Sequence, residues 1–77
     1  MNQVTIYTTP TCVWCNRAKS YLRENNISFV EKDVSRDRAA ATEMINKTNQ
    51  MGVPVLDING SVIIGFDQYG INRLLGL

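Results

Sequence analysis

The spacing of apolar residues changes several times along this chain of 77 residues. Four short runs are rich in apolar and β-branched residues and are bounded by turn residues, which is typical of buried strands. Between and after these runs, apolar residues recur every three or four positions, as in amphipathic helices. The expected strands span residues 2–9, 27–34, 53–58 and 61–64, and the expected helices span residues 13–25, 36–47 and 68–75.

Residues with capping and turn preferences lie at the ends of these segments. The expected helix-end signals are Asn25-Asn26, Ser35 as an N-cap, Asp37 in a first turn and Asp67 as a further cap. Asn59-Gly60 is typical of a two-residue hairpin because both positions tolerate positive φ. The side chains expected in the core are Ala18, Tyr21, Leu22, Phe29, Ala40, Met44, Ile45, Ile71, Leu74 and Leu75.

The element order is β-α-β-α-β-β-α, which indicates an α/β fold. The first two strands are joined by a helix and should be parallel through a right-handed crossover. The last two strands should form an antiparallel hairpin. One mixed four-stranded sheet flanked by three helices, with helices on both faces, accommodates this order. Residues 1–77 are expected to form a single domain, because a chain this short has one small core.

Composition narrows the possible functions. Eight basic and seven acidic residues give a net charge of +1, which offers no electrostatic reason to expect nucleic acid as a partner. No apolar run approaches the roughly 20 residues that span a bilayer, and no signal-peptide pattern precedes the first strand. We therefore expect a cytoplasmic monomer without a membrane partner, in a compartment that keeps thiols reduced.

Cys12 and Cys15 lie where the first expected strand passes into the first helix, and the chain has no other cysteine and no histidine. A thiol at a helix N-terminus has its thiolate stabilised by free N–H groups and by the helix dipole. A second thiol three positions on lies about one turn away, close enough for a disulfide. The pattern predicts two-electron thiol–disulfide chemistry, with Cys12 as nucleophile and Cys15 as resolving thiol.

A metal site and a structural disulfide are the alternatives for this pair. A closed zinc site takes four ligands, usually cysteine or histidine, which this chain does not supply. Two chains could hold a shared iron–sulfur cluster with four thiolates. A structural bridge across three residues closes almost no loop and adds little stability. The sequence favours redox function, with no metal and no tightly bound cofactor expected.

Three further residues each have two interpretations. Lys19, one turn past Cys15, either supports the thiolate or is a solvated helix lysine. Trp14 either presents an apolar contact surface to a partner or folds back onto the domain. Pro54 opens an expected central strand, where proline is disfavoured, and its bond to Val53 is either cis, turning the Val53 backbone outward, or trans.

On these residues, the chain resembles the glutaredoxins of the thioredoxin superfamily, in particular the short glutaredoxin-like proteins of YruB type. The matching segments occur in the family's order and extend over essentially the whole chain. They are residues 7–15, Ala18-Lys19, residues 52–54 and residues 64–67. The resemblance implies a thioredoxin/glutaredoxin-like fold, a cis Val53–Pro54 bond and glutathione as a co-substrate.

In glutaredoxins, glutathione lies across the first cysteine, the residue before the cis-proline and the start of the last helix. By position, the resemblance implies that Val53 pairs with the glutathione backbone. The Phe66 N–H and Asp67 hold the γ-glutamyl end, and Gln50 reaches the glycine carboxylate. The full set of implied substrate- or glutathione-binding residues is Val13, Trp14, Gln50, Val53, Pro54, Gly65, Phe66 and Asp67.

Three positions depart from the family's usual pattern. Thr9 replaces a lysine, Ile64 replaces the first glycine of a Gly-Gly pair, and Val13-Trp14 replaces Pro-Tyr between the cysteines. Loss of the lysine removes a charge pair to the glycine carboxylate, worth about 0.5–1 kcal/mol at an exposed site. Glutathione binding is therefore expected to be weakened.

These observations predict a small dithiol oxidoreductase that reduces protein disulfides, glutathione mixed disulfides, or both, through its Cys-Val-Trp-Cys motif. Its expected partners are disulfide-containing proteins, with glutathione or thioredoxin reductase as the electron source. One alternative is a thioredoxin-reductase-dependent electron donor of the ribonucleotide-reductase type. Another, of a different class, is a dimeric carrier of a 2Fe–2S cluster.

Overall fold

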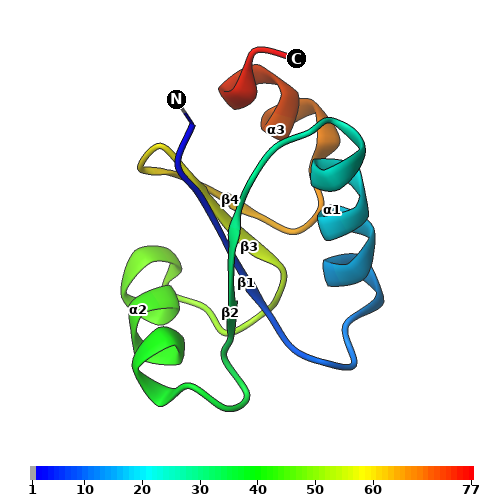
Figure 1. The fold of residues 1–77 in the computed structure, drawn as a ribbon. Helices are drawn as coiled ribbons and strands as arrows, with labels where there is room; N and C mark the ends of the chain where they lie inside the picture. The colour runs from blue at the N-terminus through cyan, green and yellow to red at the C-terminus, as the bar shows by residue number, and fades with distance from the viewer. Residues whose placement is uncertain (1) are drawn as a thin grey trace.

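The computed structural model describes residues 2–77 and has the predicted element order β-α-β-α-β-β-α (Figure 1). The strands are β1 (Val4–Thr8), β2 (Val30–Asp33), β3 (Val55–Ile58) and β4 (Ser61–Ile64), and the helices are α1 (Val13–Glu24), α2 (Arg38–Thr48) and α3 (Gln68–Leu75). Within these described residues, no helix is long and apolar enough to cross a membrane.

The four strands form one mixed sheet in the order β2-β1-β3-β4. β1 pairs with β2 in parallel and with β3 in antiparallel register, and β3 and β4 form an antiparallel hairpin. The hairpin turns at Asn59 and Gly60, whose φ angles are +54° and +93°. The parallel first pair, the hairpin and its turn residues therefore match the predicted topology.

Helices cover both faces of the sheet, with α1 and α3 on one face and α2 on the other (Figure 1). Adjacent residues of β1 serve opposite layers, because side chains alternate along a strand. Ile6 packs under α1 and α3, whereas Tyr7 packs under α2, and both are fully buried. The buried face of α1 consists of Cys15, Ala18 and Leu22, at helical spacing. The packing of α1 on the sheet therefore fixes where its first turn lies.

A polar cluster holds α2 against the sheet. The Tyr7 hydroxyl donates a hydrogen bond to Glu43 and accepts one of 2.9 Å from Lys47 Nζ. Lys47 also binds the Asp57 carboxylate at 2.6 Å, and this hydrogen bond is the main cause that raises the pKa of Lys47. The buried tyrosine ring thus keeps its hydroxyl satisfied while it packs in the core.

Several predicted boundaries are wrong by a few residues. β1, β2 and β3 are shorter than the predicted runs, because the residues before each strand, and Thr9 and Val34 after β1 and β2, lie outside the ladders. Ser35 does not cap α2. Its N–H and hydroxyl bind the Asp33 carboxylate two residues earlier, which forms a local turn before the helix. Asp37 is the N-cap instead, accepting a 3.0 Å hydrogen bond from the Ala40 N–H.

Two predicted core residues are exposed. Ile45 follows the buried Met44 by one position, and the helix turns its side chain about 100° away from the sheet. Leu74 is also exposed, because Leu75 packs against the core one turn after the buried Ile71. Phe29 does contact the core from the segment before β2 and is partly buried.

Three connections that are distant in sequence meet at the same end of the sheet. β1 leads directly to the cysteine pair, and Pro54 precedes β3, which is antiparallel to β1. The link from β4 to α3 reaches the same place, because the Gly65 N–H donates a 2.8 Å hydrogen bond to the Pro54 carbonyl. The fold thereby places the β1–α1, α2–β3 and β4–α3 connections beside one another.

Candidate active site

Cys12 and Cys15 form a disulfide at the start of α1, with their Cα atoms 5.2 Å apart. Cys12 is the N-cap residue, and its Sγ accepts a 3.0 Å hydrogen bond from the Cys15 N–H. Cys15 is fully buried under the first turn, whereas Cys12 is partly exposed. The more accessible sulfur therefore belongs to the residue predicted to be the nucleophile.

This geometry favours a thiolate at Cys12 once the disulfide is reduced. The Cys12 sulfur lies where the first N–H groups of α1 have no partner within the helix, and the N–H of Cys15 points at it. Hydrogen bonds and the helix dipole stabilise the charged form of a thiol in this position. Cys15 lies within disulfide reach, so it can attack a mixed disulfide formed at Cys12.

An apolar groove of about 310 Å³ adjoins the pair and is lined by Trp14, Val53, Pro54, Gly65 and Phe66. These five residues were all predicted to bind substrate or glutathione, and the fold brings them together from three connections. The Val53–Pro54 bond is cis, as the family resemblance implied. The groove thus begins at Trp14, one of the two residues between the cysteines.

Trp14 points outward rather than into the core. Its side chain is 55% exposed, and Val13 beside it is 63% exposed. The Arg17 guanidinium lies over the indole ring, 4.8 Å from its centroid, in a cation–π contact. Of the two interpretations of Trp14, the structure supports the exposed apolar surface beside the reactive pair.

Phe66 lines the groove just before α3, and Asp67 follows it as the residue that caps this helix. The Phe66 ring packs edge to face on Tyr21 of α1, with ring centroids 5.7 Å apart. Asp67 caps α3 by accepting a 3.1 Å hydrogen bond from the Gly70 N–H. A Cβ on Gly70 would lie 2.8 Å from an Asp67 carboxylate oxygen, so glycine leaves room for this cap.

Gln50 is engaged within its own loop. Its amide oxygen accepts a 2.6 Å hydrogen bond from the Gly52 N–H, and its amide nitrogen donates to the Gly52 carbonyl and to Thr48 Oγ1. The side chain therefore shapes the loop that leads into Val53. A direct contact with a glutathione carboxylate requires these bonds to be exchanged.

Lys19 is bound to a partner that the sequence did not reveal. Its Nζ lies 2.8 Å from Glu31 Oε2 on β2, and the Lys19 side chain is only 16% exposed. The same carboxylate oxygen accepts a 2.8 Å hydrogen bond from Thr8 at the end of β1. The hydrogen bond from Lys19 is the main cause that lowers the pKa of Glu31, so this carboxylate is charged at neutral pH. The sequence did not indicate this network, because Thr8, Lys19 and Glu31 lie on three separate elements and both other residues meet at the Glu31 carboxylate.

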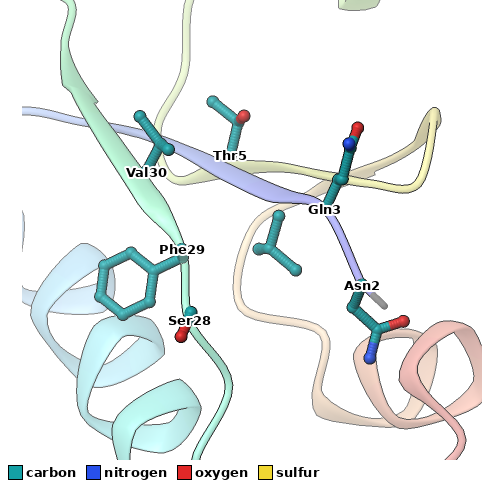
Figure 2. A pocket seen from close by; sticks show the side chains of 7 residues that line it. Asn2, Gln3, Thr5, Ser28, Phe29 and Val30 are labelled. Carbon is teal, nitrogen blue, oxygen red and sulfur yellow. The ribbon is translucent and has the colours of Figure 1, made fainter.

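A second hollow, of about 390 Å³, lies at the other end of β1 (Figure 2). It is lined by Asn2, Gln3, Val4, Thr5, Ser28, Phe29 and Val30, where β2 has not yet joined the ladder. None of these side chains is charged or carries a thiol. Among residues 2–77, no group of three or more histidine, cysteine, aspartate or glutamate side chains is arranged to hold a metal ion. The cysteine pair and its groove remain the strongest candidate site.

A mixed sheet between helical layers, with a Cys-x-x-Cys disulfide at the start of its first helix, defines a thiol–disulfide oxidoreductase of the thioredoxin fold. A family model described as Glutaredoxin matches residues 4–63. The chain belongs to the glutaredoxin family, as the sequence resemblance indicated.

Known relatives of similar length support this assignment. The chain is 43% identical, over 94% of its own length and 96% of the relative's, to an uncharacterized glutaredoxin-like 8.6 kDa protein in the rubredoxin operon of Clostridium pasteurianum. It is 36% identical to glutaredoxin 3 of Escherichia coli K12, over 100% of this chain and 94% of that protein. Among solved structures, the glutaredoxin-like NrdH-redoxin of Escherichia coli superposes with a TM-score of 0.82 at 29% identity, covering 94% of this chain and 93% of that one.

Proposed function

We propose that this protein is a dithiol oxidoreductase that reduces protein disulfides and glutathione mixed disulfides through Cys12 and Cys15. The observation that carries the proposal is the placement of Cys12 as N-cap of α1, with its sulfur on the Cys15 N–H and beside the apolar groove. The expected location is the cytoplasm, where cellular reductants maintain dithiols.

The reaction begins with the reduced dithiol. The Cys12 thiolate attacks one sulfur of a substrate disulfide, forming a mixed disulfide and releasing the first substrate sulfur as a thiolate that takes up a proton. Cys15 then loses its proton and attacks the Cys12 sulfur. This step releases the second substrate thiolate and leaves the Cys12–Cys15 disulfide, so two electrons have passed to the substrate. An external reductant restores the dithiol.

Glutathione is the proposed co-substrate, bound loosely along the groove. Val53 and Pro54 border the groove on one side, and Phe66 borders it at the start of α3. The amide groups and dipole at that helix start favour an anionic ligand. The cationic groups nearby are engaged elsewhere, because Lys19 binds Glu31 and Arg17 lies over Trp14. Weak binding therefore follows from the site's shape combined with its shortage of free positive charge.

Placing a lysine at position 9 tests this shortage. The Thr9→Lys variant is expected to use glutathione better, lowering its KM by up to a few-fold, because a new charge pair is worth about 0.5–1 kcal/mol. The measurement is deglutathionylation kinetics as a function of glutathione concentration, with Thr9→Gln as the uncharged control of similar length. An equal gain in both variants, or none, contradicts this account of the site.

A second reductant has a specific observation in its favour. The NrdH-redoxin of Escherichia coli, which resembles this chain over nearly its whole length, is described as a glutaredoxin-like protein with a thioredoxin-like activity profile. The exposed Val13 and Trp14 would suit contact with a protein reductant. The alternative is therefore an electron donor that thioredoxin reductase reduces.

Supplying each reductant separately shows whether glutathione or thioredoxin reductase is the electron source. The oxidised protein is mixed with glutathione, glutathione reductase and NADPH, or with thioredoxin reductase and NADPH, and NADPH oxidation is followed with a protein disulfide as final acceptor. We expect turnover with glutathione at millimolar concentration. Turnover with thioredoxin reductase alone supports the alternative, and turnover with neither system contradicts the proposed function.

A further inference from the structure

Lys19 shares one face of α1 with both cysteines. Positions 12, 15 and 19 are separated by three and then four residues, so they follow one line along the helix. A helical rise of 1.5 Å per residue places position 19 about 10 Å from position 12 along the axis. A charge at that distance, at the edge of a protein interior, is close enough to influence a thiolate.

Glu31 brings an opposite charge to the same place. Its carboxylate binds Lys19 Nζ at 2.8 Å and the Thr8 hydroxyl at 2.8 Å. Thr8 ends β1 and is 1% exposed, and only three residues separate it from Cys12. The ion pair is therefore fixed beneath the connection that carries the nucleophile, with one charge of each sign.

The other charged groups around the pair have separate engagements. On α1, Arg17 lies over the Trp14 ring, and Arg23, whose charge also contributes to lowering the pKa of Glu31, lies over the Phe29 ring. On α3, Asp67 caps the helix through the Gly70 N–H. At the end of β2, the Asp33 carboxylate accepts hydrogen bonds from Ser35. The Lys19–Glu31 pair differs from these groups because it combines a mostly buried amine with a hydrogen bond to the last residue of β1.

We propose that Glu31 tunes the reactivity of Cys12 by offsetting the Lys19 charge. Because the two charges of the Lys19–Glu31 ion pair largely cancel at Cys12, the helix N-terminus remains the main source of thiolate stabilisation. Glu31 is in this view a positioning residue that acts through Lys19 and Thr8. The inference rests on the proposed role of Cys12 as nucleophile. In this proposal, β2 helps to set the reactivity of the cysteine pair at the start of α1, although no residue of β2 lines the groove.

Removing the Glu31 charge and removing the Lys19 charge should shift the Cys12 pKa in opposite directions. Glu31→Gln leaves Lys19 positive and without its carboxylate partner, which favours the thiolate and lowers the Cys12 pKa by about half a unit. Lys19→Gln leaves the Glu31 carboxylate unpaired, which disfavours the thiolate and raises this pKa by a similar amount. The double variant Lys19→Gln/Glu31→Gln should return to the wild-type value, because both charges are gone.

The measurement is the rate of iodoacetamide alkylation of the fully reduced protein as a function of pH, with Cys12 labelling identified by mass spectrometry. Glu24→Gln is the matched control, because it removes the same charge from the exposed last turn of α1 and should leave the pKa unchanged. Thr8→Val removes the hydrogen bond to Glu31 without changing any charge. It should lower the melting temperature, and it should shift the Cys12 pKa less than either charge variant does.

The possible outcomes distinguish a failure of the Glu31 proposal from a failure of the proposed oxidoreductase function. Opposite shifts in the two single variants, with recovery in the double variant, support the proposal. Shifts of one sign in Glu31→Gln, Lys19→Gln and Thr8→Val, or no shift in any of them, overturn it and leave the nucleophile assignment intact. A wild-type Cys12 that titrates no lower than the roughly 8.5 of a free thiol contradicts the proposed function itself.

Discussion

A Cys12→Ser variant is expected to lose all thiol–disulfide turnover, falling to the rate of the uncatalysed exchange. A serine hydroxyl is not ionised at neutral pH and cannot form a disulfide, so no mixed disulfide with substrate arises. The buried Cys15 thiol does not replace it, because its sulfur lies under the first turn of α1 and is fully excluded from solvent. The measurement is steady-state reduction of a protein disulfide, together with alkylation of the reduced thiols.

Cys15→Ser is the matched comparison for this loss. It keeps the exposed nucleophile, so it should trap protein substrates as stable mixed disulfides, visible on a non-reducing gel. External glutathione can still attack a glutathione mixed disulfide at Cys12, so part of the deglutathionylation activity should remain. Faster alkylation of Cys15 than of Cys12 reverses the two roles, and full protein-disulfide turnover by Cys15→Ser rules out the dithiol mechanism.

Leu22→Ala is expected to cost about 2–5 kcal/mol of folding free energy. Leu22 is fully buried one turn after Ala18, in the apolar cluster that joins α1 and α3 to the sheet. Natural domains have only about 5–15 kcal/mol of stability in total, so this loss is a large share of it. In a domain of this size it corresponds to a fall in Tm of at least about 10 °C. Thermal unfolding followed by circular dichroism measures the change.

Leu74→Ala is the matched control for this truncation. Leu74 is 37% exposed, beside an open hollow between α3 and β4. The same deletion there leaves no enclosed cavity, and we expect a loss of well under half the Leu22 value. Equal losses at the two sites contradict the assignment of Leu22 as the anchor of α1.

Local signals in the sequence were sufficient to predict the order of elements and the sheet topology. The hairpin at Asn59-Gly60 depends on two adjacent residues that tolerate positive φ, and the buried stripe of α1 depends on helical spacing. The cysteine pair was predicted for the same reason, because a strand, a thiol and a helix follow each other directly. The cis Val53–Pro54 bond required the family resemblance, since base rates for proline favour trans.

Contacts between distant segments were not predicted. Glu31 meets Lys19 only because β2 lies beside β1 and under α1, and nothing in the residues around Glu31 indicates this. The capping error at α2 has a different origin, since Asp33, only two residues upstream, competes with the helix N-terminus for Ser35. Gln50 was assigned to a ligand on position alone, whereas its amide closes its own loop. Only the Lys19–Glu31 pair follows from tertiary geometry, whereas Ser35 and Gln50 each choose among local partners that the sequence pattern does not rank.

The groove is assembled from segments that leave the ribosome at very different times. The two thiols are present once the first fifth of the chain has been made, but Pro54 follows much later, and Phe66 comes only near the end. A growing chain therefore carries the two thiols before it has the groove that we propose to bind substrate. On the proposed function, any selectivity that the groove confers on the two thiols can arise only when α3 docks beside α1 and brings Phe66 to Trp14.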